Sequence, residues 1–167
     1  MKRGIQSVLA LFARQVAKLD AEIRQRLENE EEFAELNRVL RSVPGVGPVT
    51  AAVLIADMPE LGSADRRAIA SLAGLAPRAF ESGKFKGKRR LGQGRRYVRK
   101  ALYMAALSVI AQRKLFRASI ESMKAAGKPA KTVVVAIARK LLTLLNILVT
   151  RNEIFSFEKI TANPNPQ

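Results

Sequence analysis

Apolar residues recur at helical spacing along most of the chain, and the clearest run lies in its first thirty residues. There the intervals alternate between four and three residues, which is the a/d pattern of a coiled coil. The positions are Ile5, Leu9, Phe12, Val16, Leu19 and Ile23. Three heptads make a weak coiled coil on their own. We therefore expect residues 1–28 to form a helix that builds a homo-oligomer, pairs with another segment, or lies on the surface of its own domain.

The same spacing predicts further helices downstream. A second helix, over residues 31–41, begins with acidic side chains, which the positive end of a helix favours. Ser63 is expected to cap a helix that continues to Ala73. Two more helices are expected over residues 95–111 and 114–126, and the second of these ends before a glycine.

The last expected helix, over residues 129–151, is the most apolar one, which makes it the candidate for the centre of the core. Its core positions are Val133, Val134, Ile137, Leu141, Leu144, Leu145 and Leu148. By contrast, residues 76–94 have no helical period and are punctuated by glycine and proline, which indicates a long loop or a small β-hairpin. The predicted fold is all-α, with a coiled-coil or linker helix over 1–30, a helix-hairpin-helix-containing domain over 31–155 and a flexible tail over 156–167.

A glycine-rich turn joins the second expected helix to the third. Its apolar anchors, Val43 and Val46, alternate with Gly45 and Gly47, which permit positive φ and leave no Cβ in the way of an approaching phosphate. Pro48 suits the first turn of a helix, where its missing N–H is not needed. We expect backbone N–H groups of Gly45, Val46 and Gly47 to bind a phosphate oxygen. The alternative is a tight turn between two helices without such a contact.

Positive charge is concentrated in the second part of the chain. The 167 residues carry 30 Lys and Arg against 14 Asp and Glu, a net charge of +16. Residues 1–60 hold eight basic and nine acidic side chains, so the excess belongs to residues 61–167. This balance is typical of proteins that bind a polyanion, although ribosomal and membrane-surface proteins share it.

The densest part of this charge runs from Arg78 to Lys100, with ten basic residues and one acid, Glu81. We expect these ten side chains to bind nucleic acid: Arg78, Lys84, Lys86, Lys88, Arg89, Arg90, Arg95, Arg96, Arg99 and Lys100. The last four stand at the start of the next helix, where cations oppose the helix dipole. Phosphates are the obvious anions to compensate them.

Composition excludes several chemistries. The chain has no Cys, His or Trp, so disulfides, Cys/His metal sites and His-dependent triads are ruled out, and no metal site is expected. The most apolar stretch, residues 132–149, is split by Arg139 and Lys140 and leaves no uninterrupted apolar run of about 18 residues. We expect a cytoplasmic, nucleoid-associated protein that has no membrane partner.

Several short motifs, each weak alone, occur in the order found in one known family. They are VPGVGPVTA at 43–51, LAGLAPR at 72–78, SG at 82–83, RR at 95–96, RKALY at 99–103, GKPAK at 127–131 and ARKLL at 138–142. In this order the chain resembles the C-terminal domain of bacterial insertion-sequence transposases whose N-terminal domain is RuvC-like with a DEDD carboxylate set, the bridge-RNA-guided recombinases. Residues 1–28 are similar to part of the coiled coil that links the two domains.

The resemblance implies a catalytic role for Ser82, because the serine of the Ser-Gly pair is taken as the nucleophile on DNA in that family. It implies DNA and, in the full-length protein, a guide RNA as partners, and Mg²⁺ only in the RuvC-like domain. Residues 1–60 show no counterpart of that domain, so we expect this chain to be inactive by itself. Serine needs an activating group, and Arg78, Lys84 and Lys86 can support a developing phosphorane.

Two further readings of the residues stay open. A helix-hairpin-helix module can bind DNA or structured RNA without doing chemistry, and it would share every charge feature described above. A basic ribosome-associated or architectural protein is a third class, although such proteins rarely need a glycine phosphate cradle. Ser82 and a partner domain separate the first two classes.

Overall fold

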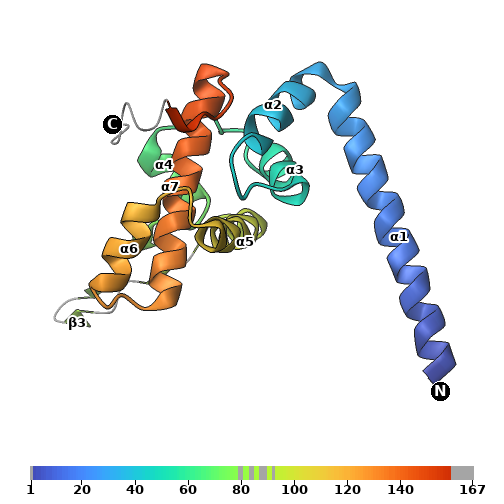
Figure 1. Ribbon diagram of the computed structural model, residues 1–167, viewed down its shortest axis with the longest axis horizontal. Helices are drawn as coiled ribbons and strands as arrows, with labels where there is room; N and C mark the ends of the chain where they lie inside the picture. Colours follow the sequence, from blue (N-terminus) through green and yellow to red (C-terminus); the bar gives the residue numbers. More distant parts are fainter. Residues whose placement is uncertain (1, 79–80, 83–84, 87–89, 92, 159–167) are drawn as a thin grey trace. The chain divides into compact units, whose positions relative to one another are not determined.

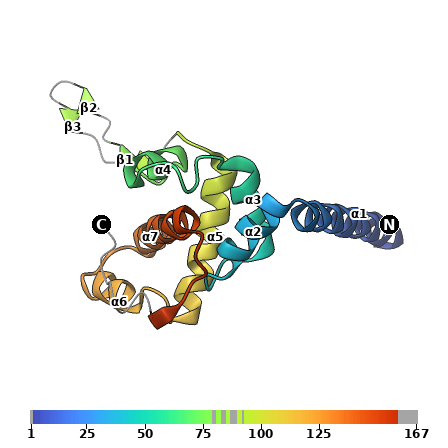
Figure 2. The same cartoon turned by 90° about the horizontal axis from the view of Figure 1, so that it is seen from above.

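The computed structural model describes residues 2–78, 81–82, 85–86, 90–91 and 93–158. Seven helices and four two-residue strands occur in these ranges (Figures 1 and 2). The helices are α1 Lys2–Asn29, α2 Glu31–Arg41, α3 Pro48–Asp57, α4 Arg66–Leu72, α5 Arg96–Gln112, α6 Arg117–Ala125 and α7 Ala130–Arg151. The strands are β1 Pro77–Arg78, β2 Glu81–Ser82, β3 Phe85–Lys86 and β4 Arg90–Leu91. The all-α prediction is confirmed.

The chain divides into two compact units, Met1–Glu35 and Leu36–Gln167. The first unit is dominated by α1, a continuous helix of 28 residues. All six predicted seam residues are exposed along it, from 46% for Ile23 to 62% for Leu9 and Phe12. The predicted a/d positions thus form one continuous apolar stripe along α1.

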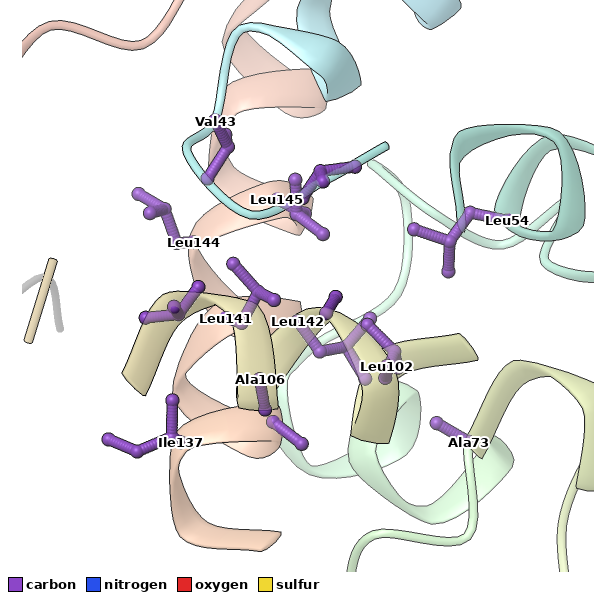
Figure 3. Close-up of a cluster of buried hydrophobic side chains, with 14 of the residues drawn as sticks. Val43, Leu54, Ala73, Leu102, Ala106, Ile137, Leu141, Leu142, Leu144 and Leu145 are labelled. Atoms are coloured by element: carbon purple, nitrogen blue, oxygen red, sulfur yellow. The ribbon is translucent and has the colours of Figure 1, made fainter. Parts of the chain in front are cut away.

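In the second unit the centre of the core is α7, as the apolar pattern predicts. Helix α7 packs against α4, α5 and α6, and Figures 1 and 2 show α5 crossing it steeply. Ile137, Leu141 and Leu145 are fully buried, and Leu102 of α5 and Leu54 of α3 belong to the same cluster (Figure 3). Burying such side chains is the main source of stability for the unit. Helix α7 is long and apolar enough to cross a membrane, and here half of its most apolar stretch is buried in protein.

Two helix starts differ from their prediction. Helix α4 is capped by Asp65, whose carboxylate accepts hydrogen bonds from the N–H groups of residues 67 and 68 at 2.6 and 2.9 Å. Ser63 instead donates to the carbonyl of Glu60, so the Ser63 cap was wrong. Helix α6 begins at Arg117, three residues later than predicted, because Phe116 adopts a left-handed conformation.

The predicted loop between α4 and α5 contains the β-hairpin that the sequence left open. β1 pairs antiparallel with β4, and β2 pairs antiparallel with β3. The outgoing and returning halves of the segment therefore run side by side. We call the segment between Gly74 and Gly94 the basic arm.

Candidate nucleic-acid interface

The glycine turn between α2 and α3 is held mainly by its apolar anchors. Val43 and Val46 are buried, with 1% and 6% of their surface exposed. The N–H of Val46 donates to the carbonyl of Val43 at 3.1 Å. Val46 thus offers neither its side chain nor its N–H to a phosphate, and it is a packing residue rather than the ligand that the sequence suggested.

Gly45 has a role that the sequence analysis did not foresee. Its φ is +93°, and a Cβ built on it would lie 2.6 Å from Cγ2 of Val109 and 3.2 Å from the carbonyl oxygen of Ala105. Both of those residues belong to α5. The absence of a side chain at Gly45 therefore serves close packing of the turn on α5 rather than access for a ligand.

Gly47 fits a phosphate contact better, because of its missing Cβ and not because of its φ. Its φ is −89°, so Gly47 does not use the positive φ that glycine permits. It is the N-cap of α3, and it makes no side-chain cap. A Cβ on Gly47 would meet nothing within 4 Å among the described residues. The turn thus presents an uncapped helix start, with Pro48 at its first position, to open space.

The basic arm begins and ends at one point, where two glycine backbones cross. A Cβ on Gly94 would lie 2.5 Å from the backbone nitrogen of Gly74 and 2.7 Å from the carbonyl oxygen of Leu72. Both glycines have positive φ, +70° at Gly74 and +87° at Gly94. The N–H of Arg95 donates to the same Leu72 carbonyl at 2.8 Å. This crossing fixes the base of the arm on the helical unit.

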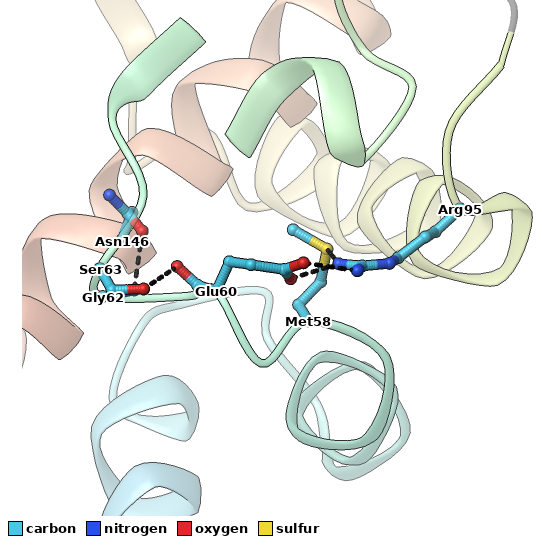
Figure 4. Close-up of polar contacts among 6 residues, drawn as sticks. All are labelled: Met58, Glu60, Gly62, Ser63, Arg95 and Asn146. Atoms are coloured by element: carbon cyan, nitrogen blue, oxygen red, sulfur yellow. Dashed lines mark hydrogen bonds and ion pairs between the residues drawn. The ribbon is translucent and has the colours of Figure 1, made fainter. Parts of the chain in front are cut away.

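An ion pair strengthens the same base. Nη1 and Nη2 of Arg95 donate to the two carboxylate oxygens of Glu60 at 2.5 and 2.6 Å, and Nη1 also lies 3.2 Å from Sδ of Met58 (Figure 4). Glu60 sits in the turn after α3, and Asn146 of α7 holds that turn by accepting from the N–H of Gly62 at 2.8 Å. Arg95 was expected to bind nucleic acid, whereas the structure gives it an intramolecular partner.

The hydrogen bonds from Arg95 are the main reason that the pKa of Glu60 falls from 4.5 to about 2. Because the folded-state pKa lies below the ordinary one, the pair stabilises the fold above about pH 4.5, and this contribution is lost as pH falls towards 2. In urea titrations from pH 7 to 2, we expect Glu60→Gln to be less stable than the unsubstituted chain at neutral pH and the difference to shrink in acid.

Glu121→Gln is the matched control, because Glu121 forms an exposed ion pair with Arg117 inside a single helix. Such pairs are worth little. A Glu60→Gln difference that stays constant from pH 7 to 2 would show that the bidentate pair does not stabilise the fold.

The first turns of α5 carry the other predicted cations. Arg96 and Lys100 are exposed, and Arg99 donates to the carbonyl of Gln93 at 3.1 Å. The first turn holds no acidic residue. Arg96 and Lys100 therefore add positive charge at the positive end of a helix, an arrangement that an anionic ligand would relieve.

The strand register adds a second concentration of charge. Arg78 stands directly opposite Arg90 in the β1–β4 pair, and Lys86 stands opposite Glu81 in the β2–β3 pair. Like charges at opposed positions destabilise a sheet unless a counter-charge binds. Ser82, the predicted nucleophile, lies on β2 opposite Phe85. The further candidates, Lys84, Lys88 and Arg89, lie outside the described residues.

The structure thus brings part of the predicted site residues together and gives others, such as Arg95, intramolecular partners. Strand pairing brings Arg78, Lys86, Arg90 and Ser82 into one arm, whose base is fixed to the start of α5. Sequence reasoning missed Glu60, because its partner is 35 residues away and no local spacing points to it. The crossing of Gly74 and Gly94 was equally hidden, although each glycine alone was a visible turn signal.

Comparison with known proteins decides the family. Residues 37–121 match the family described as "Transposase IS116/IS110/IS902 family". The chain belongs to this transposase family. The matched range contains the glycine turn, the basic arm and the whole of α5, so the candidate interface lies entirely within the family domain. The resemblance to insertion-sequence transposases is therefore confirmed.

Individual relatives agree with this assignment. The chain is 32% identical over 145 residues to the pilin gene-inverting protein of Moraxella bovis, covering 84% of this chain and 45% of that protein. It is 32% identical over 166 residues to the 42 kDa protein of insertion element IS900 from Mycobacterium paratuberculosis, covering 93% and 41%. A 43.6 kDa protein of insertion element IS110 from Streptomyces coelicolor is 31% identical over 144 residues, covering 85% and 35%. The transposase-family chain thus spans less than half the length of these relatives.

Proposed function

We propose that this chain is the DNA-binding, nucleophile-bearing C-terminal part of an insertion-sequence transposase, acting in DNA transposition and recombination. Family membership supports the general activity. One relative is named a pilin gene-inverting protein, and inversion of a gene is a DNA rearrangement. The observation that carries the DNA-binding part is the opposition of Arg78 and Arg90 on an arm whose base lies beside Arg96 and Lys100.

The proposed chemistry is attack by the hydroxyl of Ser82 on a DNA phosphate. The Oγ–P bond forms, the bond from phosphorus to one deoxyribose oxygen breaks, and that oxygen takes up a proton. The serine hydroxyl gives its proton to a base. This base is not a histidine of the chain, because the chain has none. Neighbouring cations of the arm would stabilise the charge of the pentavalent phosphorane.

The proposal places no Mg²⁺ site in this chain. Among the described residues, no three carboxylates gather into a group that could hold a metal ion. We place Mg²⁺ in the RuvC-like domain of a full-length protein, together with the base that activates Ser82. A guide RNA is proposed as a second partner of the full-length protein. The proposed site of action is the bacterial nucleoid in the cytoplasm.

DNA binding is tested by its dependence on salt. If the arm and the start of α5 neutralise about 6–8 phosphates, a plot of log affinity against log salt should have a slope of roughly −5 to −7. Fluorescence anisotropy with a labelled duplex measures it. Lys100→Ala should make the slope shallower by about 1. Lys124→Ala on the exposed side of α6 is the control and should leave the slope unchanged. A slope near −1 to −2 would show that the arm is not the interface.

A non-catalytic helix-hairpin-helix module that binds DNA or structured RNA is the second candidate. Its support is the uncapped start of α3 at Gly47. Both candidates share the salt dependence, and they differ in whether Ser82 becomes linked to DNA.

We further propose that α1 assembles the chain into a homo-oligomer. Its six apolar seam residues are between 46% and 62% exposed, which is unusual for so long a stripe. Light scattering should give a mass of two or more chains for the intact protein and of a single chain for a version that starts at Glu31. Val16→Glu, in the middle of the seam, should also lower the mass, whereas Arg14→Glu beside it should not. Masses that correspond to a single chain for all four proteins would contradict the proposal.

A further inference from the structure

One large aromatic side chain at the start of α5 is not used by the core. Tyr97 is 62% exposed, whereas the other tyrosine, Tyr103, is half-buried and packs against the hydrophobic cluster. Aromatic rings usually contribute by being buried. An exposed ring on a helix that supports the core at Val98 and Leu102 is therefore available for a ligand.

The ring of Tyr97 already has a cation on it. The guanidinium carbon of Arg96 lies 5.0 Å from the ring centroid, and Nη2 of Arg96 donates to the Tyr97 hydroxyl at 3.1 Å. A guanidinium at this distance is held by cation–π attraction. The pair forms a platform made of a planar cation and a planar ring, and both residues are exposed.

The surroundings of the platform select an anionic ligand. Lys100 is exposed one turn further along α5. Both ends of the basic arm also lie close to the start of this helix, because Gly74 and Gly94 cross directly before Arg95. Met104, two turns along the same face, is also exposed, at 57%, but Lys100 is the one basic residue within four positions of it, whereas four basic residues lie that close to Tyr97. Charge therefore distinguishes the Tyr97 end of this face from the rest.

We propose that Tyr97, backed by Arg96, stacks on an unpaired base of a DNA strand, while Arg96 and Lys100 contact its phosphates. A base presents a flat face to a ring only when it is not stacked inside a duplex, so the preferred ligand is single-stranded or locally opened DNA. This inference rests on the proposed DNA-binding function and specifies which form of DNA the start of α5 takes.

Tyrosine fluorescence tests the stacking directly, because the chain has two tyrosines and no tryptophan. In a Tyr103→Phe background, Tyr97 is the only emitter. A short DNA strand without self-complementarity should quench its emission on binding, and the matching duplex should quench it much less. Bound single-stranded DNA, seen by anisotropy, that leaves the emission unchanged would overturn the proposal. Quenching by the same sequence as RNA but not as DNA would overturn the assignment to DNA.

Affinity gives the second readout. Tyr97→Ala should weaken binding of the single strand by about five- to hundredfold, as expected for loss of one stacked base, without changing the salt slope. Tyr97→Phe keeps the ring and should stay within about twofold. Met104→Ala is the control for an exposed apolar side chain on the same helix and should have no effect. A Tyr97→Ala protein that binds the strand normally while Lys100→Ala binds it weakly would refute the stacking and leave the proposed DNA binding intact. Absence of any DNA binding would overturn both.

Discussion

Replacing Ser82 by alanine in a full-length transposase that contains this domain is expected to abolish recombination and the covalent protein–DNA adduct. The reason is chemical: without the hydroxyl no Oγ–P bond can form, and no other residue of the arm is a comparable nucleophile. DNA affinity should stay within about twofold, because one neutral hydroxyl contributes at most roughly 1 kcal/mol to binding. Loss of activity with retained binding separates chemistry from recognition.

The adduct is measured by denaturing electrophoresis with labelled DNA in the presence of the guide RNA and Mg²⁺. Ser63→Ala is a suitable control, because Ser63 is an exposed serine whose hydroxyl donates to a backbone carbonyl in its own turn. Recombination that survives in the Ser82→Ala protein would remove the nucleophile assignment and favour the non-catalytic binding module.

Substituting the two glycines of the α2–α3 turn should have opposite consequences. Gly45→Ala is expected to destabilise the fold by about 2–4 kcal/mol, because alanine is strained at positive φ and its methyl would collide with Val109. Gly47→Ala should cost only about 0.5–1 kcal/mol, because its φ is ordinary and its Cβ meets nothing, and the remaining cost is that alanine is a poorer N-cap than glycine. If the start of α3 holds a phosphate, the same methyl should weaken DNA binding.

Urea denaturation and anisotropy on the two variants separate packing from recognition. The Gly47→Ala protein folds in either case, so its DNA affinity is interpretable. Unchanged affinity in that protein would show that the turn only joins two helices. A Gly45→Ala protein as stable as the unsubstituted chain would contradict the close packing of the turn on α5.

Elements dictated by local period were predictable, and contacts between distant residues were not. The stripe on α1 and the apolar run of α7 follow directly from side-chain spacing, so both helices were predicted within one or two residues. The cap of α4 was misplaced because Ser63 and Asp65 both suit an N-cap, and only the backbone geometry chooses Asp65. The sequence therefore narrows the N-cap of α4 to two nearby residues but does not choose between them.

The candidate site shows the same division. The cationic character of the arm follows from composition, whereas the role of each cation depends on where the fold brings it. Arg95 resembles Arg96 in the sequence, yet Glu60 engages the first and Tyr97 contacts the second. Gly45 and Gly47 look equivalent as well, and it is the approach of α5 that makes one a packing residue and leaves the other open.

The crossing of Gly74 and Gly94 also bears on how far the arm of this chain can change in length. Because the chain leaves the helical body just beyond the buried Leu75 and returns to it at Gly94, the length of the paired strands adds little to the cost of closing the arm. A change in the number of residues between Arg78 and Arg90 should therefore leave the free energy of unfolding of the helical body nearly unchanged. The helical core and the paired strands of the arm are thus two parts of one chain that can be redesigned separately.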